Sequence, residues 1–340
     1  MRTDDFDFEL PAALIAQSPA EPRDSSRLMV LRLPRRTISH HHFSDLPTFL
    51  RAGDVLVVND TRVMAARLFG VRPDTGGRVE ALLLRPLTDR RWEVLFRPAR
   101  AAVPGREFVF ETADGPVQAT VIARGEGAVS LEFVRQIDPA TAGSVPLPPY
   151  IKGYVGDPER YQTVYNREPR SAAAPTAGLH FTPELLQRIE ALGVTIAPVT
   201  LEVGAGTFKP VTVDDPHQHQ LHAERYTVPP ETAAAIVIAK AEGRRVIAIG
   251  TTVVRTLEHV ARENGGAIVP SSGWTELRIL PGDPFLVIDA LVTNFHLPRS
   301  TLLMLVSAFA GQEFVMEAYR LAVDEGYRFY SFGDAMLLLP

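Results

Sequence analysis

The sequence predicts an α/β protein: a large mixed α/β, barrel-like body that carries an inserted all-β small barrel domain. Two observations lead to this prediction. Between residues 54 and 147, short segments rich in β-branched and aromatic residues follow one another, with glycine and proline turns and no helix between them. After residue 150, helical and strand patterns alternate, which is typical of mostly parallel strands joined by crossover helices.

The individual elements follow from these patterns. Strands of the β region are expected at 54–59, 79–84, 91–96, 107–110, 117–122 and 128–133. Helices are expected at 183–192, 230–242, 252–263, 300–309 and 313–324, and strands at 194–203, 245–249, 285–293 and 327–339. A short helix at 11–17 and a strand at 27–33 fit the α/β body. We therefore expect a discontinuous body of residues 1–60 and 149–340, with residues 61–148 as an inserted, arginine-rich β-barrel.

Composition limits the class of protein. The 340 residues are 46% hydrophobic and 22% charged, as in ordinary globular enzymes. The chain has no cysteine, which excludes disulfides, thiolate nucleophiles, Fe–S clusters and cysteine zinc sites. The N-terminus lacks a signal-peptide pattern, and the longest apolar run, 302–310, is too short to span a bilayer. We expect a cytoplasmic protein with no membrane partner.

Charge is unevenly distributed. Residues 61–106 contain ten arginines and four acidic residues, a net charge of +6, so the rest of the chain carries −11 of the total of −5. A basic module on an acidic body is typical of a protein that holds a polyanion at one place. Arginines on a solvated strand face are the structural alternative.

The segment 172–182, Ala-Ala-Ala-Pro-Thr-Ala-Gly-Leu-His-Phe-Thr, is the most informative part of the chain. It is free of acidic and basic residues other than His180, and Thr182 and Pro183 suit the start of a helix directly behind it. A loop of small residues before a helix leaves backbone N–H groups free for a ligand. We expect His180 at the lip of this loop, where an imidazole can exchange a proton near neutral pH. A loop packed against a neighbouring strand, with His180 as a hydrogen-bonded core residue, is the structural alternative.

Polar residues also follow four of the expected strands, and ligands of α/β sheets bind beyond the carboxyl ends of strands. The first strand ends in Asn-Asp-Thr-Arg at 59–62, where Asp60 offers an acceptor and Arg62 a cation. The second ends in a segment with a carboxylate, two glycines that permit close backbone approach, and a hydroxyl: Glu202, Gly204, Gly206 and Thr207. No Gly-x-Gly-x-x-Gly follows, so a dinucleotide fold is not expected.

The third and fourth strand ends carry further candidates. Thr251 follows the strand at 245–249 and can cap a helix, and Arg255 lies one turn later as a grip for a carboxylate. The strand at 285–293 runs into Asn294, Phe295 and His296, so an amide, an aromatic ring and an imidazole stand together. A purely structural turn would rarely combine these three groups.

Taken together, these segments resemble the S-adenosylmethionine:tRNA ribosyltransferase-isomerase family of queuosine biosynthesis. The similar segments follow the family's order over nearly the whole chain: 25–28, 59–62, 147–151, 161–165, 173–182, 203–208, 250–258, 293–298 and 327–336. The resemblance implies an α/β body with an inserted β-barrel. It also implies a reaction in which the ribosyl part of S-adenosylmethionine moves to the aminomethyl group of a 7-deazaguanine in the tRNA anticodon, giving epoxyqueuosine, adenine and methionine.

The implied reaction assigns roles to the candidates. The sulfonium acidifies the ribose C5′ proton, and His180 or His296 would be the base, with Glu202 or Asp60 behind it. Asn294 or the other histidine would hydrogen-bond the leaving adenine. Phe181, Phe208 or Phe295 would face the sulfonium, and Arg255 or Arg62 would bind the methionine carboxylate. The expected S-adenosylmethionine site also includes Thr176, Gly178, Gly204, Gly206, Thr207 and Thr251.

The resemblance implies no metal and no cofactor beyond the co-substrate S-adenosylmethionine. The partner it implies is a tRNA with a GUN anticodon that carries the 7-deazaguanine precursor, bound by a monomer without an obligate protein partner. Two alternatives stay open on the residues alone. One is a non-catalytic RNA-binding protein, and the other is a metal-dependent nucleotide hydrolase that uses His217, His219 and His222.

Overall fold

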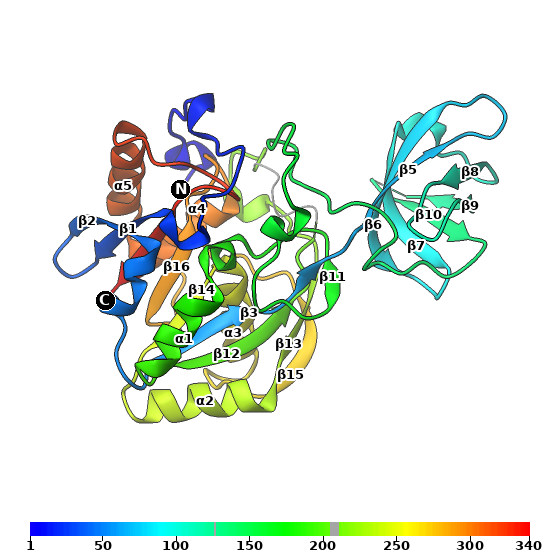
Figure 1. Cartoon of the computed structure of the whole chain (residues 1–340). Coiled ribbons are helices and arrows are strands. Elements are labelled where there is room, and N and C mark those ends of the chain that lie inside the picture. The colour runs from blue at the N-terminus through cyan, green and yellow to red at the C-terminus, as the bar shows by residue number, and fades with distance from the viewer. Residues whose placement is uncertain (126, 205–210) are drawn as a thin grey trace.

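A nine-stranded mixed sheet forms the centre of the larger body (Figure 1). The computed structural model describes residues 1–125, 127–204 and 211–340. The strands lie in the order β15, β13, β12, β3, β14, β16, β17, β1 and β2. Their bounds are β1 Arg27–Arg32, β2 Thr37–His42, β3 Val55–Asn59, β12 Thr195–Leu201, β13 Glu224–Val228, β14 Val246–Ile249, β15 Ser271–Thr275, β16 Ala290–Asn294 and β17 Ala335–Leu339.

Four neighbouring strands in the middle of this sheet, β12, β3, β14 and β16, run parallel. Strand β17 pairs antiparallel with β16 and parallel with β1, and β2, β13 and β15 add antiparallel pairs at the two edges. The mixed α/β class is confirmed. The sheet is open and not barrel-like, however, and fewer strands are parallel than expected, because short connections such as β1 to β2 permit antiparallel pairing.

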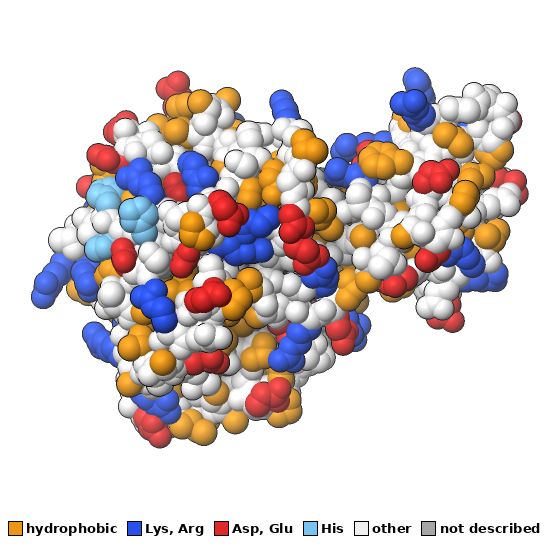
Figure 2. Space-filling model, viewed as in Figure 1, with side chains coloured by type: hydrophobic (Ala, Val, Ile, Leu, Met, Phe, Trp, Pro, Cys, Tyr) orange, Lys and Arg blue, Asp and Glu red, His pale blue; other side chains and the backbone are white. Residues whose placement is uncertain are grey.

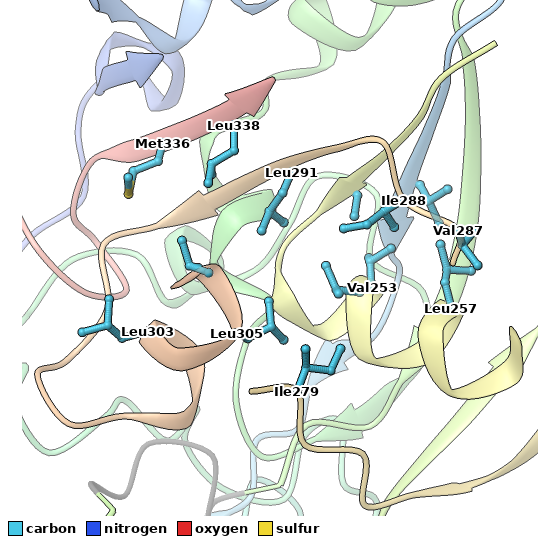
Figure 3. Packing of buried hydrophobic residues seen from close by; sticks show 14 of the residues in the cluster. Val253, Leu257, Ile279, Val287, Ile288, Leu291, Leu303, Leu305, Met336 and Leu338 are labelled. Carbon is cyan, nitrogen blue, oxygen red and sulfur yellow. The ribbon is translucent and has the colours of Figure 1, made fainter. Parts of the chain in front are cut away.

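Helices cover both faces of the sheet and bury two separate cores. One face carries α1 (Pro183–Ala191) and the 3-10 helix η4 (Phe43–Phe49). The other face carries α2 (Pro230–Ala241), α3 (Thr251–Glu263), α4 (Thr301–Ala310) and α5 (Gln312–Asp324). Figure 3 shows this second core, in which side chains of α3 and α4 meet Leu291 of β16 and Leu338 of β17. Side chains of β1, β3, β14, β16 and β17 alternate between the two cores, so this part of the sheet is covered on both sides.

Local signals place the helix starts at one edge of the sheet. The Thr182 hydroxyl accepts a hydrogen bond from the Leu185 N–H at 3.1 Å, and Ser300 caps α4 in the same way. Helix α3 begins directly after β14, and Gly250 makes this sharp turn with φ of 91°. These turns bring the N-termini of α3 and α4 to the edge where the parallel strands end.

Six strands close into a separate barrel, which lies beside the body in Figure 1. They are β5 Arg67–Val71, β6 Arg78–Pro86, β7 Arg91–Arg97, β8 Glu107–Phe110, β9 Val117–Arg124 and β10 Val129–Phe133. The barrel has its own hydrophobic core, built around aromatic side chains such as Trp92 and Phe108. The inserted β-barrel is thus confirmed as an architecture. We propose that residues 61–148 form this inserted domain.

Several elements differ from the sequence-based expectation. Strands β2, β5, β13 and β15 are not predicted, because their polar or glycine-containing sequences lack a strong strand pattern. Gly70 in β5 is required there, since an added Cβ would lie 2.6 Å from the Val109 carbonyl oxygen. Residues 285–289 and 327–334 precede their strands as loops, and the helix expected at 11–17 is a single 3-10 turn, Ala12–Leu14.

No single helix within the described ranges is long and apolar enough to cross a membrane. Helices α4 and α5 reach that length and composition only as a pair, bent by 117° between them.

Candidate active site

The carboxyl ends of the four parallel strands lie side by side, as their order in the sheet requires. Beyond them come the four polar segments singled out in the sequence: 202–204 after β12, 59–62 after β3, 250–252 after β14 and 294–296 after β16. The 3-10 helix η7 (Thr176–His180) lies at the same edge, against β16. The structure therefore gathers segments that are distant in the chain at one edge of the sheet.

Three adjoining hollows lie along this edge, and Leu302 lines all of them. The Glu224–Arg255 hollow, named after its charged residues, is the largest, with about 610 Å³ of empty space including its open mouth. The threonine hollow is lined by Thr176, Thr251, Thr252, Thr293 and His296. The tyrosine hollow is lined by Tyr150, Tyr330, Asn294, His296 and Thr176.

His296 lines both the threonine and the tyrosine hollow. Its Nε2 lies 2.8 Å from the Thr293 hydroxyl, and its backbone N–H donates to the Tyr319 hydroxyl at 3.0 Å. These two contacts fix the ring and its backbone. Burial lowers the pKa of His296 to about 3, so the imidazole is neutral at physiological pH.

His180 lies elsewhere than expected: it is buried beneath the loop and not at its lip. Its Nδ1 lies 2.7 Å from the Ser26 hydroxyl, and its ring stacks on Phe43. Nε2 has no hydrogen-bond partner among the described residues. Burial is the main cause that lowers the pKa of His180 to about 4, while Asp334 and the Asn294 side chain act in the opposite direction.

His180 does not line the hollows that His296 faces. It lines a fourth hollow, with Arg23, Arg160 and Ser331. Ser331 also lines the tyrosine hollow, so the two spaces share this residue. In the tyrosine hollow, the Asn294 amide donates to the Tyr330 carbonyl at 3.0 Å.

An ion pair lies in the wall of the largest hollow. Arg255 and Glu224 bond to each other through Nη1 and Oε2, and their side chains are only 5% and 4% exposed. Arg255 Nε also donates to the Leu277 carbonyl, and the Gly204 N–H donates to Glu224 Oε1 at 2.8 Å. Sequence reasoning finds Arg255 and Gly204 but misses the role of Glu224, because β13 is not predicted.

Comparisons with known proteins identify the family of the chain. The sequence profile described as "Queuosine biosynthesis protein" matches residues 3–338. The chain belongs to this family. Two relatives named S-adenosylmethionine:tRNA ribosyltransferase-isomerase, from Moorella thermoacetica and Symbiobacterium thermophilum, are 54% and 55% identical over the full length of both chains. The crystal structure of S-adenosylmethionine tRNA ribosyltransferase from Thermotoga maritima is 42% identical, covers 98% of this chain and all of that one, and gives a TM-score of 0.57.

In this family member, the two candidate carboxylates do not contact the histidines. Asp60 accepts a hydrogen bond from Thr200 at 2.6 Å and lies 3.5 Å from Arg167, while Glu202 lies 3.7 Å from Arg170. Burial raises the pKa of both carboxyls. Within the described ranges neither is bonded to a histidine, so the idea that they stand behind the base is not supported.

The Arg62 side chain is engaged in contacts away from the hollows. It lies in β4 (Arg62–Val63), which pairs with β11 (Pro169–Ser171), and it bonds to Asn166 at 2.8 Å and to Glu159. It lines none of the four hollows described above. Arg62 is therefore a poor candidate for the methionine carboxylate, and Arg255 is the better one.

The aromatic residues expected beside the sulfonium are mostly in the core. Phe181 is fully buried and packs on Phe43, and Phe295 packs on aromatic rings beneath the sheet edge. Phe181 lines none of the four hollows, whereas Phe295 lines the tyrosine hollow. Tyr150 and Tyr330, whose ring centroids are 4.7 Å apart, line the same hollow. Gly206, Thr207 and Phe208 lie outside the described residues.

The histidine-rich loop does not form a metal site in the described part of the chain. His219 and His222 line the Glu224–Arg255 hollow, while His217 is exposed and bonds to Asp215 at 3.1 Å. No group of three histidine, aspartate or glutamate side chains is placed to hold a metal ion among the described residues. The geometry thus gives no support to zinc binding by His217, His219 and His222.

Gly178 in η7 is needed for packing. A Cβ added there would overlap the Tyr165 hydroxyl and would lie 2.8 Å from Cγ2 of Thr163. We expect Gly178→Ala to lower the free energy of unfolding by about 1–3 kcal/mol, as overpacking of a buried site does. The buried Tyr165 hydroxyl has no partner in the described chain, so adding Tyr165→Phe removes the closest of the overlaps and an unsatisfied group. Urea unfolding of the single and double variants checks this: a double variant no more stable than Gly178→Ala would contradict the packing explanation.

Proposed function

We propose that this protein is an S-adenosylmethionine:tRNA ribosyltransferase-isomerase. It transfers and isomerises the ribosyl group of S-adenosylmethionine onto 7-aminomethyl-7-deazaguanine in a tRNA with a GUN anticodon, and releases adenine and methionine. It acts in the cytoplasm and needs no further cofactor. One observation carries the proposal: in a chain of this family, a neutral, buried imidazole faces two connected hollows at the carboxyl edge of a parallel sheet.

His296 is the base in this proposal. The positive sulfur of the substrate makes the adjacent C5′ proton acidic, and a neutral imidazole both accepts that proton and avoids repelling the sulfur cation. Of the two histidines, His296 lines the hollows of the threonines and tyrosines, while His180 lines only the hollow with Arg23 and Arg160.

The tyrosine hollow suits the aromatic and cationic parts of the substrate. Tyr150 and Tyr330 offer ring faces to a sulfonium or a nucleobase. The Asn294 amide lines this hollow and can hydrogen-bond the leaving adenine. In the threonine hollow, the N-terminal end of α3 offers Thr251 and Thr252 to the ribose hydroxyls.

The barrel supplies part of the tRNA contact. Many of its arginines are paired with acids, such as Arg85 with Glu93 at 2.6 Å, and Figure 2 shows both charges interspersed on this face of the barrel. Arg97 and Arg100 are exposed and form no ion pair with the described residues. Exposed arginines of this kind bind phosphates and make affinity salt-dependent.

Charge reversal tests this surface. We expect replacement of Arg85, Arg97 and Arg100 by glutamate to weaken tRNA binding and to lower the salt slope by roughly 0.7–0.9 for each phosphate group that the variant no longer neutralises. Filter binding with precursor tRNA across a salt series measures both quantities. The same number of reversals at exposed arginines of the body (Arg35, Arg188 and Arg320) is the control. Equal effects of the two triple variants would remove the barrel from the binding surface.

Adenine release tests the proposed function as a whole. The protein is incubated with S-adenosylmethionine and with tRNA that does or does not carry the 7-aminomethyl-7-deazaguanine base. We expect free adenine, free methionine and modified tRNA in equal amounts, and only with the modified precursor. A protein that binds the tRNA but releases no adenine would be a non-catalytic RNA-binding protein, and the proposal would fail.

A further inference from the structure

In the largest of the three hollows, the carboxylate of Glu224 lies beside Arg255, the candidate for the methionine carboxylate. Glu224 of β13 and Arg255 of α3 both line it, although their side chains are more than nine-tenths buried. Each is held from a second side, Arg255 by the Leu277 carbonyl and Glu224 by the Gly204 N–H. The two charges are therefore fixed in position before any ligand arrives.

The guanidinium has capacity left for a ligand. Arg255 Nη2 is buried and has no hydrogen-bond partner among the described residues. An unpaired buried donor is costly, and a charged one more so, which favours a site that is completed by a ligand. A carboxylate oxygen in turn accepts more than one hydrogen bond, so Glu224 can hold a donor in addition to its present partners.

The rest of the hollow is largely apolar. Its lining includes the aliphatic side chains of Leu221, Leu277, Ile279, Leu302 and Leu305. Such walls fit a short aliphatic chain and lower the local dielectric, which strengthens charged hydrogen bonds inside. Leu302 continues into the threonine hollow, so a ligand with its charged end at Glu224 and Arg255 can extend toward His296.

The charges decide which kind of ligand fits. A lone anion bound to Arg255 would also meet the adjacent carboxylate of Glu224, and a lone cation would meet the guanidinium. A zwitterion with neighbouring positive and negative groups matches both charges at once and leaves none of them unpaired. An α-amino acid end, with its ammonium and carboxylate on one carbon, has this arrangement.

We infer that the Glu224–Arg255 hollow binds the α-amino acid end of S-adenosylmethionine, with Arg255 on the carboxylate and Glu224 on the ammonium. This inference rests on the proposed function and names a subsite for it. Held there, the methionine side chain runs along the leucines, and its sulfur reaches the threonine hollow that His296 faces. Glu224 and Arg255 thus orient the sulfonium and are binding residues that take no part in proton transfer.

Equilibrium binding without tRNA tests the subsite separately from turnover. The ligands are S-adenosylhomocysteine, its decarboxylated analogue, its deaminated analogue and 5′-methylthioadenosine, which lacks the whole amino acid end. The wild-type protein is expected to bind S-adenosylhomocysteine roughly ten- to a hundredfold more tightly than each of the other three. Glu224→Gln should abolish the preference over the deaminated analogue, and Arg255→Lys should reduce the preference over the decarboxylated one.

Two controls keep the result interpretable. Glu258 lies one turn after Arg255, is fully buried and accepts backbone N–H groups of residues 286–288, away from the hollow. Glu258→Gln should lower thermal stability and leave the ligand preferences unchanged. If either single variant does not fold, the double variant Glu224→Gln/Arg255→Met, which leaves no unpaired charge, replaces it and should bind S-adenosylhomocysteine no better than 5′-methylthioadenosine.

The outcomes separate the two proposals. Wild-type protein that binds 5′-methylthioadenosine as tightly as S-adenosylhomocysteine, while releasing adenine with precursor tRNA, overturns the subsite and leaves the proposed function standing. The subsite is also overturned if Glu224→Gln and Arg255→Lys both keep every preference for S-adenosylhomocysteine over its analogues. If the wild-type protein and the variants show the expected ligand preferences but the wild type releases no adenine, the subsite is supported and the proposed function is wrong.

Discussion

Replacing His296 by glutamine is expected to slow adenine release by roughly two to four orders of magnitude, the usual contribution of a general base. The glutamine amide can keep the hydrogen bond that His296 Nε2 makes with the Thr293 hydroxyl, so the local packing is retained. What disappears is the neutral imidazole that faces the threonine and tyrosine hollows. Single-turnover assays with saturating S-adenosylmethionine and precursor tRNA measure the chemical step directly.

Two comparisons make this result specific to the base. His42→Gln, at an exposed position at the end of β2, is the matched control and should leave the rate unchanged. Binding of S-adenosylhomocysteine should be nearly the same in His296→Gln as in the wild type, because the amino acid end and the ring faces still make their contacts. A full rate in His296→Gln, together with a large loss in His180→Gln, would assign the base to the other histidine.

The edge of the sheet at which the site lies could be predicted from the sequence, because the residue pattern at the end of each strand marks it. Each of the four strands is short and apolar, and each ends in polar or glycine residues that a buried strand would not carry. Parallel pairing then brings these ends together without further information. The neutral state of His296 depends instead on burial by side chains from other parts of the chain, which no local pattern shows.

The site residues that the sequence misses or misplaces share one physical cause. The sequence does not identify Glu224 as the partner of Arg255, because the two are 31 residues apart and the polar sequence of β13 lacks a strong strand pattern. Phe181 lies beside His180 in the chain and so looks like a ligand contact, yet its ring packs into the core on Phe43. Adjacency in sequence does not say which face of a turn a side chain takes, and only the tertiary packing decides it.

Acidification is expected to unfold the larger body because two of its histidines are buried without charge. The pKa of His180 is lowered to about 4 and that of His296 to about 3, from the ordinary value near 6.5. Below pH 6.5 the unfolded chain therefore binds protons that the folded chain does not. Stability is fully present above pH 6.5 and is lost as the pH falls, at about 1.4 kcal/mol per pH unit for each histidine. The loss from His180 ends near pH 4 and that from His296 near pH 3.

Buried carboxyls in the same body act in the opposite direction. Burial raises the pKa of Asp60 and Glu202 in the folded chain. As the pH falls, the folded chain therefore binds protons at these carboxyls before the unfolded chain does. The free energy of unfolding then falls less steeply with pH in their titration range. Between about pH 6.5 and 5.5 the histidines of the unfolded chain begin to take up protons, while Asp60 and Glu202 contribute equally in the parent and in a histidine variant. A variant that removes one histidine should lower the slope in this window by the contribution of one proton.

His180→Asn is that variant, because the asparagine amide can replace Nδ1 as the partner of the Ser26 hydroxyl while nothing titrates. Urea unfolding is followed in a Trp92→Phe background, in which Trp274 of β15 is the remaining tryptophan and reports on the body alone. The free energy of unfolding should fall less steeply with pH in His180→Asn than in the parent, and His42→Asn should leave the parent slope unchanged. Identical slopes in His180→Asn and the parent over this window would mean that His180 is not held neutral by burial.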